Sequence, residues 1–167
     1  MKKYKILFAD LDGALIDTIS GEAFPKGIWD MRLKFDVLDK IKELKPDYVF
    51  IVTNQGGIEK GFVNELSLSF KLDYIERVIS EYCECKCDYD YCRTNDKNDP
   101  YRKPNIGMLN LLCEIHLEGK DYKKSSFLMI GDASGKDGQF SDTDRKTAEN
   151  FDIDYMDVED FVKCKFE

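Results

Sequence analysis

Two carboxylates directly follow an apolar run near the start of the chain. Residues 4–9 are almost continuously apolar, and Asp10, Leu11, Asp12 and Gly13 come next. In an extended chain, residues two positions apart project to the same side, so both carboxylates can face one pocket. Two carboxylates this close repel each other unless a cation lies between them or one of them carries a proton. The pair therefore suits phosphoryl transfer, although a solvated acidic loop is the alternative for so short a motif.

Phosphate-binding groups follow a second apolar run. Thr53 and Asn54 come after residues 48–52 and offer a hydroxyl and an amide as donors to phosphate oxygens. Further along, Lys103 precedes Pro104, which we expect to open a helix that runs through residue 117. A positive charge at a helix start is unfavourable unless an anion offsets it. Both places are therefore candidate sites for a bound phosphate.

More carboxylates follow a third apolar run. Residues 127–130 end in Gly131 and Asp132, and Asp137 lies five positions beyond Asp132. Oxygen ligands of this kind suit Mg²⁺, a hard cation. A magnesium ion would bring an anionic nucleophile and an anionic substrate together.

The apolar runs alternate with patterns of helical spacing. Strands are predicted at 4–9, 48–52, 127–130 and near 151–155, and helices at 35–44, around 68–79, at 104–117 and at 143–150, with a short one at the end. We therefore expect an α/β fold, with a mostly parallel sheet covered by helices on both faces. Ligands of such sheets bind beyond the carboxyl ends of the strands, where these polar residues fall. Residues 14–34 show no clean period and are expected to form a loop or small cap.

Length and charge limit the functions that the chain can serve. Its 167 residues suit a single domain spanning 1–167. Its 33 acidic and 25 basic side chains give a net charge of −8, which argues against non-specific attraction to nucleic acid. No apolar stretch approaches the roughly 20 residues that span a bilayer, and Asp10 and Asp12 interrupt the only run resembling a signal peptide. We expect an intracellular protein, cytoplasmic or nuclear, with no membrane partner.

In this order, the motifs resemble the four signatures of the haloacid dehalogenase superfamily of phosphohydrolases. The signatures are the Asp-Leu-Asp-Gly string at 10–13, Thr53, Lys103, and Gly131-Asp132 with Asp137. The resemblance spans almost the whole chain. It implies a Rossmann-like fold with a minimal cap.

Within the superfamily, the chain is most similar to the polynucleotide 3′-phosphatases. The strings that carry this likeness lie at 53–58 (Thr-Asn-Gln-Gly-Gly-Ile), at 101–108 (Arg-Lys-Pro with Gly-Met) and at 131–145 (Gly-Asp-Ala, then Phe-Ser and Asp-Arg). The first string is shared with histidinol-phosphate and heptose-bisphosphate phosphatases. Two positions depart from the pattern: Ala14 replaces a threonine, and Gln139 stands where the polynucleotide branch places an acid. No Walker-type loop is present, so a kinase or repair partner would be a separate protein.

The resemblance implies a role for each matching residue. Asp10 is the expected nucleophile, and Asp12 is the expected general acid and then general base. Thr53 and Lys103 are expected to hold the phosphoryl oxygens. These roles describe an aspartyl-phosphate mechanism.

The resemblance also implies a set of Mg²⁺ ligands. They are Asp10, Asp132 and the backbone carbonyl of Asp12, with Asp137 as a further ligand or an orienting acid. The expected function is removal of 3′-phosphate from nucleic-acid ends, as an end-healing or repair step. The alternatives are a small-molecule phosphatase, which the acidic composition favours, and a silent module that binds phosphorylated ends.

Four cysteines, at positions 83, 85, 87 and 92, suggest a zinc site as an alternative feature. Residues 83–91 alternate between cysteine or tyrosine and charged side chains, the pattern of a half-buried strand. Structural zinc sites prefer cysteine pairs separated by two to four residues around a turn. We therefore favour a strand over zinc bound by Cys83, Cys85, Cys87 and Cys92.

Three other side chains could contribute to binding or catalysis. His116 is expected to pack or to cap a helix end rather than to catalyse. Phe24 and Trp29 could stack on a nucleotide base, but we expect them to pack within the core or cap.

Overall fold

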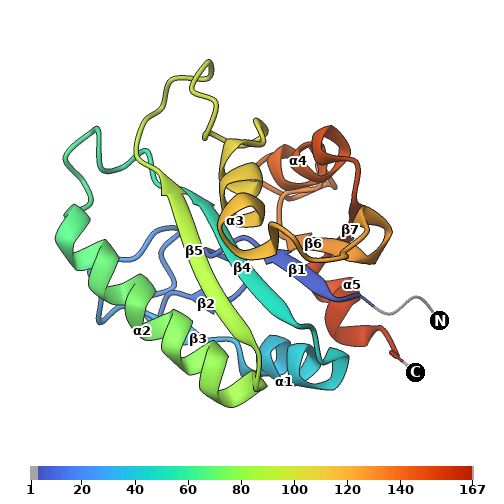
Figure 1. Cartoon of the computed structure of the whole chain (residues 1–167). Helices are drawn as coiled ribbons and strands as arrows, with labels where there is room; N and C mark the ends of the chain where they lie inside the picture. Colours follow the sequence, from blue (N-terminus) through green and yellow to red (C-terminus); the bar gives the residue numbers. More distant parts are fainter. Residues whose placement is uncertain (1–3, 167) are drawn as a thin grey trace.

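Five parallel strands form the sheet at the centre of the fold (Figure 1). The computed structural model describes residues 4–166. The strand order is β5-β4-β1-β6-β7, and each neighbouring pair is parallel. The strands are β1 (Ile6–Ala9), β4 (Tyr48–Asn54), β5 (Lys86–Cys92), β6 (Phe127–Gly131) and β7 (Asp154–Asp157). The predicted parallel sheet is thus confirmed.

Helices cover both faces of this sheet, as predicted. On one face lie α1 (Phe35–Leu44), α2 (Glu65–Cys83) and α5 (Val158–Lys163). On the other lie α3 (Gly107–Leu117) and α4 (Thr143–Phe151), and a short 3₁₀ helix spans Lys124–Ser126. Among residues 4–166, no helix is both long and apolar enough to cross a membrane.

The central strand β1 shows why its sequence is continuously apolar. Leu7 and Ala9 pack into the core cluster on the side of α1, α2 and α5. Ile6 and Phe8 pack into the cluster beneath α3 and α4. Because side chains alternate across a strand, a strand with helices on both sides has no polar face.

The expected helix at 104–117 begins later in the structure. α3 starts at Gly107, and the residues before it form a series of turns. The N–H of Gly107 donates to the carbonyl of Pro100, and the Asn105 amide donates to the carbonyls of Lys97 and Asp99. These bonds satisfy the backbone in a compact loop, so Lys103 lies in that loop rather than in a helix.

The expected strand at 83–91 also begins later. Cys83 is the last residue of α2, Glu84 adopts left-handed backbone geometry with φ of 57°, and β5 starts at Lys86. Cys83 is buried four residues after Ile79, so helical periodicity continues to this point. Cys83 therefore packs as part of helix α2, although the alternating sequence pattern predicts a strand at this position.

Residues 14–34 carry a small antiparallel pair, β2 (Ile16–Asp17) and β3 (Arg32–Leu33). The loop between the strands is organised by the buried carboxylate of Asp30, which accepts hydrogen bonds from Ser20 and from the backbone of Lys26. Phe24 and Trp29 are exposed by 68% and 69%. The expectation that these two rings pack internally is wrong, because the loop folds around a polar centre instead.

His116 packs as expected near the end of α3. Its ring lies beside the rings of Tyr48 and Phe50, and its Nε2 lies 2.6 Å from Asp88 Oδ2. These contacts place the imidazole on the sheet face beneath α3.

The aromatic packing around β1 yields a test of the core. Phe8 is fully buried, and its ring contacts those of Phe50, Phe127 and Phe151. We expect Phe8→Ala to lower the free energy of unfolding by about 3–5 kcal/mol, because a large cavity remains. Denaturant titration measures this change. The control Phe140→Ala, at a side chain 95% exposed, should change stability by less than about 0.5 kcal/mol.

Candidate active site

The loop after β1 places Asp10 at the carboxyl edge of the sheet. The Asp10 N–H donates to the carbonyl of Ile130 on β6 over 3.1 Å, which ties the loop to the neighbouring strand. Leu11 is buried, while Gly13 turns the chain with φ of 82°. A β-carbon at Gly13 would lie 2.0 Å from Asp132 Oδ2. Glycine is therefore required both by the turn and by this close approach.

A glutamine joins the groups contributed by β1 and β4. Thr53 is buried on β4, and the Gln55 side chain donates to its Oγ1 over 2.9 Å. The same Nε2 donates to Asp12 Oδ2 over 3.0 Å. Gln55 thus holds the threonine hydroxyl and the second carboxylate of the Asp-Leu-Asp-Gly string near each other.

The ammonium of Lys103 is the buried cation of the site. The residue is only 4% exposed, and its Nζ lies 2.7 Å from Asp10 Oδ1 and 2.7 Å from Asp144 Oδ1. Burial alone would lower the pKa of Lys103, but the two carboxylates raise it above its usual value. Lys103 therefore remains positively charged at neutral pH.

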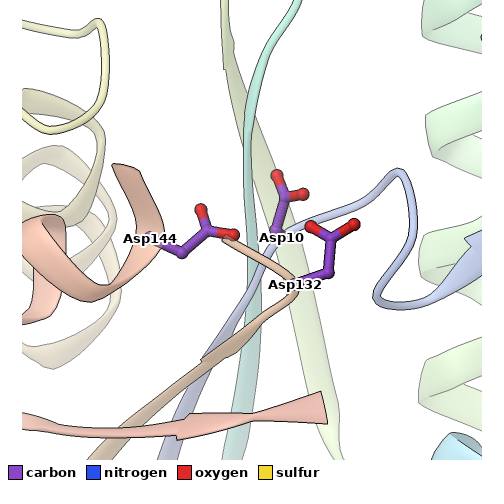
Figure 2. A group of neighbouring side chains, drawn as sticks. All are labelled: Asp10, Asp132 and Asp144. Carbon is purple, nitrogen blue, oxygen red and sulfur yellow. The ribbon is translucent and has the colours of Figure 1, made fainter. Parts of the chain in front are cut away.

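Three carboxylates lie close together at this edge of the sheet (Figure 2). Asp10, Asp132 and Asp144 each contribute an oxygen, and these oxygens lie within 4.8 Å of one another. Figure 2 shows that they come from separate elements: the end of β1, the end of β6 and the start of α4. Asp10 and Asp132 are thus close enough to share an ion.

The environment of Asp10 disfavours its negative charge. Burial, followed by the charges of Asp144 and Asp12, raises the pKa of Asp10 to about 8, against the opposing effect of Lys103. One ammonium does not balance the carboxylates around it. A further positive charge would favour ionised Asp10, the form that can act as a nucleophile.

The carboxylate group fits a divalent cation. Asp144 Oδ2 is buried without a hydrogen-bond partner among the described residues. A β-carbon at Gly131 would lie 2.2 Å from this oxygen, so the glycine leaves room for the carboxylate. All the donors are carboxylate oxygens, the ligands that hard cations such as Mg²⁺ prefer. The cluster could therefore bind a metal ion.

The structure does not bring Asp137 into this group. Asp137 is exposed on the loop after β6, and Asp144 is the third carboxylate instead. Gln139 closes the turn around Asp137: its N–H donates to the Lys136 carbonyl, and its side chain bonds to Ser134 and Asp157. This turn exposes Asp137, and the carboxylate that lies beside Asp10 and Asp132 is that of Asp144.

The Asn54 side chain, expected to bind phosphate, contacts protein backbone. Its Oδ1 accepts from the Lys103 N–H over 2.9 Å, and its Nδ2 donates to the Lys103 carbonyl over 3.0 Å. Both polar atoms of the amide thus engage the loop that carries the lysine.

Sequence reasoning missed Asp144 and Gln55. Both residues lie within strings that carry the family resemblance, at 131–145 and 53–58, and that signal could have drawn attention to them. Asp144 is also an acid in the first turn of α4. Its proximity to Lys103, however, depends on how α4 packs beside β6.

Comparison with known sequences identifies relatives over nearly the whole chain. A sequence model of the family described as polynucleotide kinase 3 phosphatase matches residues 5–162. An uncharacterized 20.8 kDa protein of Autographa californica nuclear polyhedrosis virus is 31% identical, over 97% of this chain and 87% of its own length. The bifunctional polynucleotide phosphatase/kinase of Schizosaccharomyces pombe is 31% identical over 96% of this chain, which spans 38% of that relative.

A solved structure shares the fold. D,D-heptose 1.7-bisphosphate phosphatase from B. bronchiseptica, complexed with magnesium and phosphate, aligns with a TM-score of 0.66 and 21% identity, over 87% of this chain and 75% of that one. Together, these similarities identify a phosphatase of the haloacid dehalogenase type. Within that class, the chain belongs to the polynucleotide kinase 3 phosphatase family.

The proximity of the carboxylates predicts that the charge of Asp144 raises the pKa of Asp10. We expect Asp144→Asn to lower the pKa of Asp10 from about 8 in the metal-free protein, because a nearby negative charge is removed. Titration of the Asp10 carboxyl carbon by NMR measures this shift. Asp142→Asn, in the same segment but paired with Arg145 and Lys146, is the control and should leave that pKa in place. An unchanged pKa in Asp144→Asn would contradict the electrostatic account.

Proposed function

We propose that this protein is a Mg²⁺-dependent phosphomonoesterase that removes 3′-phosphate from nucleic-acid ends through an aspartyl-phosphate on Asp10. The observation that carries this proposal is the contact between the Lys103 ammonium and the Asp10 carboxylate, at a sheet edge with two further carboxylates. A cation beside the nucleophile can hold phosphoryl oxygens where negative charge develops.

In the first step, an Asp10 carboxylate oxygen attacks phosphorus, and the bond from phosphorus to the leaving oxygen breaks. Protonated Asp12 donates its proton to that oxygen, which departs as an alcohol. The Lys103 ammonium and the Thr53 hydroxyl hold the phosphoryl oxygens. Gln55 bonds to both Asp12 and Thr53, so it holds the proton donor beside the phosphate site.

In the second step, Asp12 is ionised and acts as a general base. It takes a proton from a water molecule as the water oxygen attacks phosphorus. The bond from phosphorus to Asp10 breaks, which releases inorganic phosphate and restores the Asp10 carboxylate. Asp12 ends the cycle protonated, ready for another substrate.

The carboxylates of Asp10, Asp132 and Asp144 would hold the magnesium ion, with the backbone carbonyl of Asp12 as a further oxygen donor. When bound, Mg²⁺ supplies positive charge that keeps Asp10 ionised and attracts the substrate phosphate. Support for this metal comes from the oxygen-only donor set and from the related structure that holds magnesium and phosphate.

A phosphorylated nucleic-acid end is the proposed substrate because of the family match and the bifunctional polynucleotide phosphatase/kinase relative. The small cap at 14–34 agrees with this choice, since a large lid closing over the site would exclude a polymer end. Removal of the 3′-phosphate would serve an end-healing or repair step.

The nucleophile assignment predicts the effect of a near-isosteric change. Asp10→Asn should reduce phosphate release by about 10³-fold or more, because an amide does not form the aspartyl-phosphate. A phosphate-release assay and circular dichroism measure activity and fold. Persistent turnover by a folded Asp10→Asn protein would refute the role of Asp10.

The substrate assignment predicts a preference among phosphomonoesters. We expect faster phosphate release from a 3′-phosphorylated oligonucleotide than from its 5′-phosphorylated counterpart, histidinol phosphate or a sugar bisphosphate. Because Mg²⁺ is proposed to stabilise ionised Asp10, a chelator should abolish release and added Mg²⁺ should restore it.

The same assays separate the chemistry from the substrate. A preference for histidinol phosphate or the sugar bisphosphate would overturn the polynucleotide assignment and leave the aspartyl-phosphate mechanism standing. Full activity in the presence of chelator would instead remove the metal from the proposal.

A further inference from the structure

The Asn54 side chain forms two hydrogen bonds to one residue distant in sequence. Its Oδ1 accepts from the Lys103 N–H, and its Nδ2 donates to the Lys103 carbonyl, over 2.9 and 3.0 Å. We propose that Asn54 is a positioning residue that fixes the backbone of Lys103, and thereby its ammonium, instead of binding the substrate phosphate. The catalytic consequence rests on the proposed phosphoryl transfer.

The surroundings of Lys103 show why it needs such a partner. Asn54 is the last residue of β4, whose ladder pairs it with Cys92 of β5. Lys103 belongs to no strand or helix, and within residues 4–166 the two bonds to its backbone come from Asn54. The Asn54 side-chain amide both accepts and donates. It therefore bonds to the N–H and the carbonyl of Lys103 as a neighbouring strand would.

Backbone placement matters because the lysine side chain is long and buried. Its Nζ must reach Asp10 Oδ1 and Asp144 Oδ1, both 2.7 Å away, from a backbone on a separate loop. The side chain has four rotatable methylene groups, so a displaced backbone would weaken both contacts. Misplacement of a reacting group by about 1 Å can cost on the order of 100-fold in rate.

Other hydrogen bonds also hold the loop that carries Lys103, and one of them provides a matched control. Asn150 donates to the carbonyl of Pro104, the residue next to Lys103, over 3.0 Å from an exposed position on α4. Asn150→Ala removes a side-chain hydrogen bond to the same loop but leaves both hydrogen bonds to the Lys103 backbone intact. It tests whether any loosening of this loop is enough to impair the enzyme.

The first experiment measures kcat and KM with a 3′-phosphorylated oligonucleotide and Mg²⁺. Asn54→Ala should lower kcat by about 10- to 100-fold, because the displaced Lys103 ammonium no longer lies where negative charge develops in the transition state, and KM should change less than kcat. Asn150→Ala should match the wild type within about twofold. A raised KM with unchanged kcat would instead assign Asn54 to phosphate binding and overturn the proposal.

A double-mutant cycle tests whether Asn54 acts through Lys103. In a Lys103→Ala background, Asn54→Ala should cause no more than about a twofold further loss of the residual activity, because the group it positions is absent. An undiminished loss in that background would show an independent role and contradict the inference.

An experiment without turnover tests the same contact. Acylation of lysines by acetic anhydride, measured by mass spectrometry, should modify the buried Lys103 slowly in the wild type and about tenfold faster in Asn54→Ala. Asn150→Ala should resemble the wild type. Equal protection of Lys103 in a folded Asn54→Ala protein would overturn the positioning role.

The two readouts distinguish failure of the inference from failure of the proposed function. A wild type that releases no phosphate refutes the proposed function, while acylation still decides the role of Asn54. Should Asn54→Ala not fold, Asn54→Asp replaces it: the acceptor for the Lys103 N–H remains, and a second oxygen faces the carbonyl. Faster labelling of Lys103 in Asn54→Asp than in the wild type supports the inference, and equal labelling contradicts it.

Discussion

The site depends on one buried ammonium held among carboxylates. Lys103 is almost completely buried, and moving an ammonium out of water costs several kcal/mol unless close anions compensate. Asp10 and Asp144 lie 2.7 Å from the ammonium and provide that compensation in their ionised forms. The same carboxylates, together with Asp132, exceed the positive charge of one lysine. The excess negative charge therefore favours binding of a further cation. The same electrostatics thus bear on the stability of the site and on its chemistry.

The parallel sheet determines which residues can meet at this cluster. β1, β4 and β6 are neighbours, and all of them end at the same edge, so Asp10, Thr53 and Asp132 come together although they are far apart in sequence. Lys103 and Asp144 arrive by other routes, from a loop and from a helix start. Hydrogen bonds fasten both segments. The side chain of Asn54, at the end of β4, bonds to the Lys103 backbone, and the Asp144 N–H donates to the carbonyl of Ala133 in the loop after β6.

The proposed reacting groups and the exposed apolar side chains lie on different parts of the molecule. The groups proposed to react lie on buried or half-buried residues at the edge of the packed sheet. In contrast, segments that follow β1, β4 and β6 expose large apolar side chains, including Trp29, Phe62 and Phe140. The net charge of −8 adds repulsion toward a polyanion.

By itself, the sequence determined the elements and the acids at their ends. Continuous apolar runs identify strands buried on both faces, and parallel strands share a carboxyl edge, so local pattern was enough to place Asp10, Thr53 and Asp132 at one edge of the sheet. Only the tertiary structure decided that Asp144 and not Asp137 joins them, and that the Asn54 amide faces backbone. Those outcomes depend on the paths of loops, which are set by hydrogen bonds between residues about forty to fifty positions apart, such as Asn54 with Lys103 and Lys103 with Asp144. Residue spacing does not predict such bonds, because they form only when the sheet and its helices pack together.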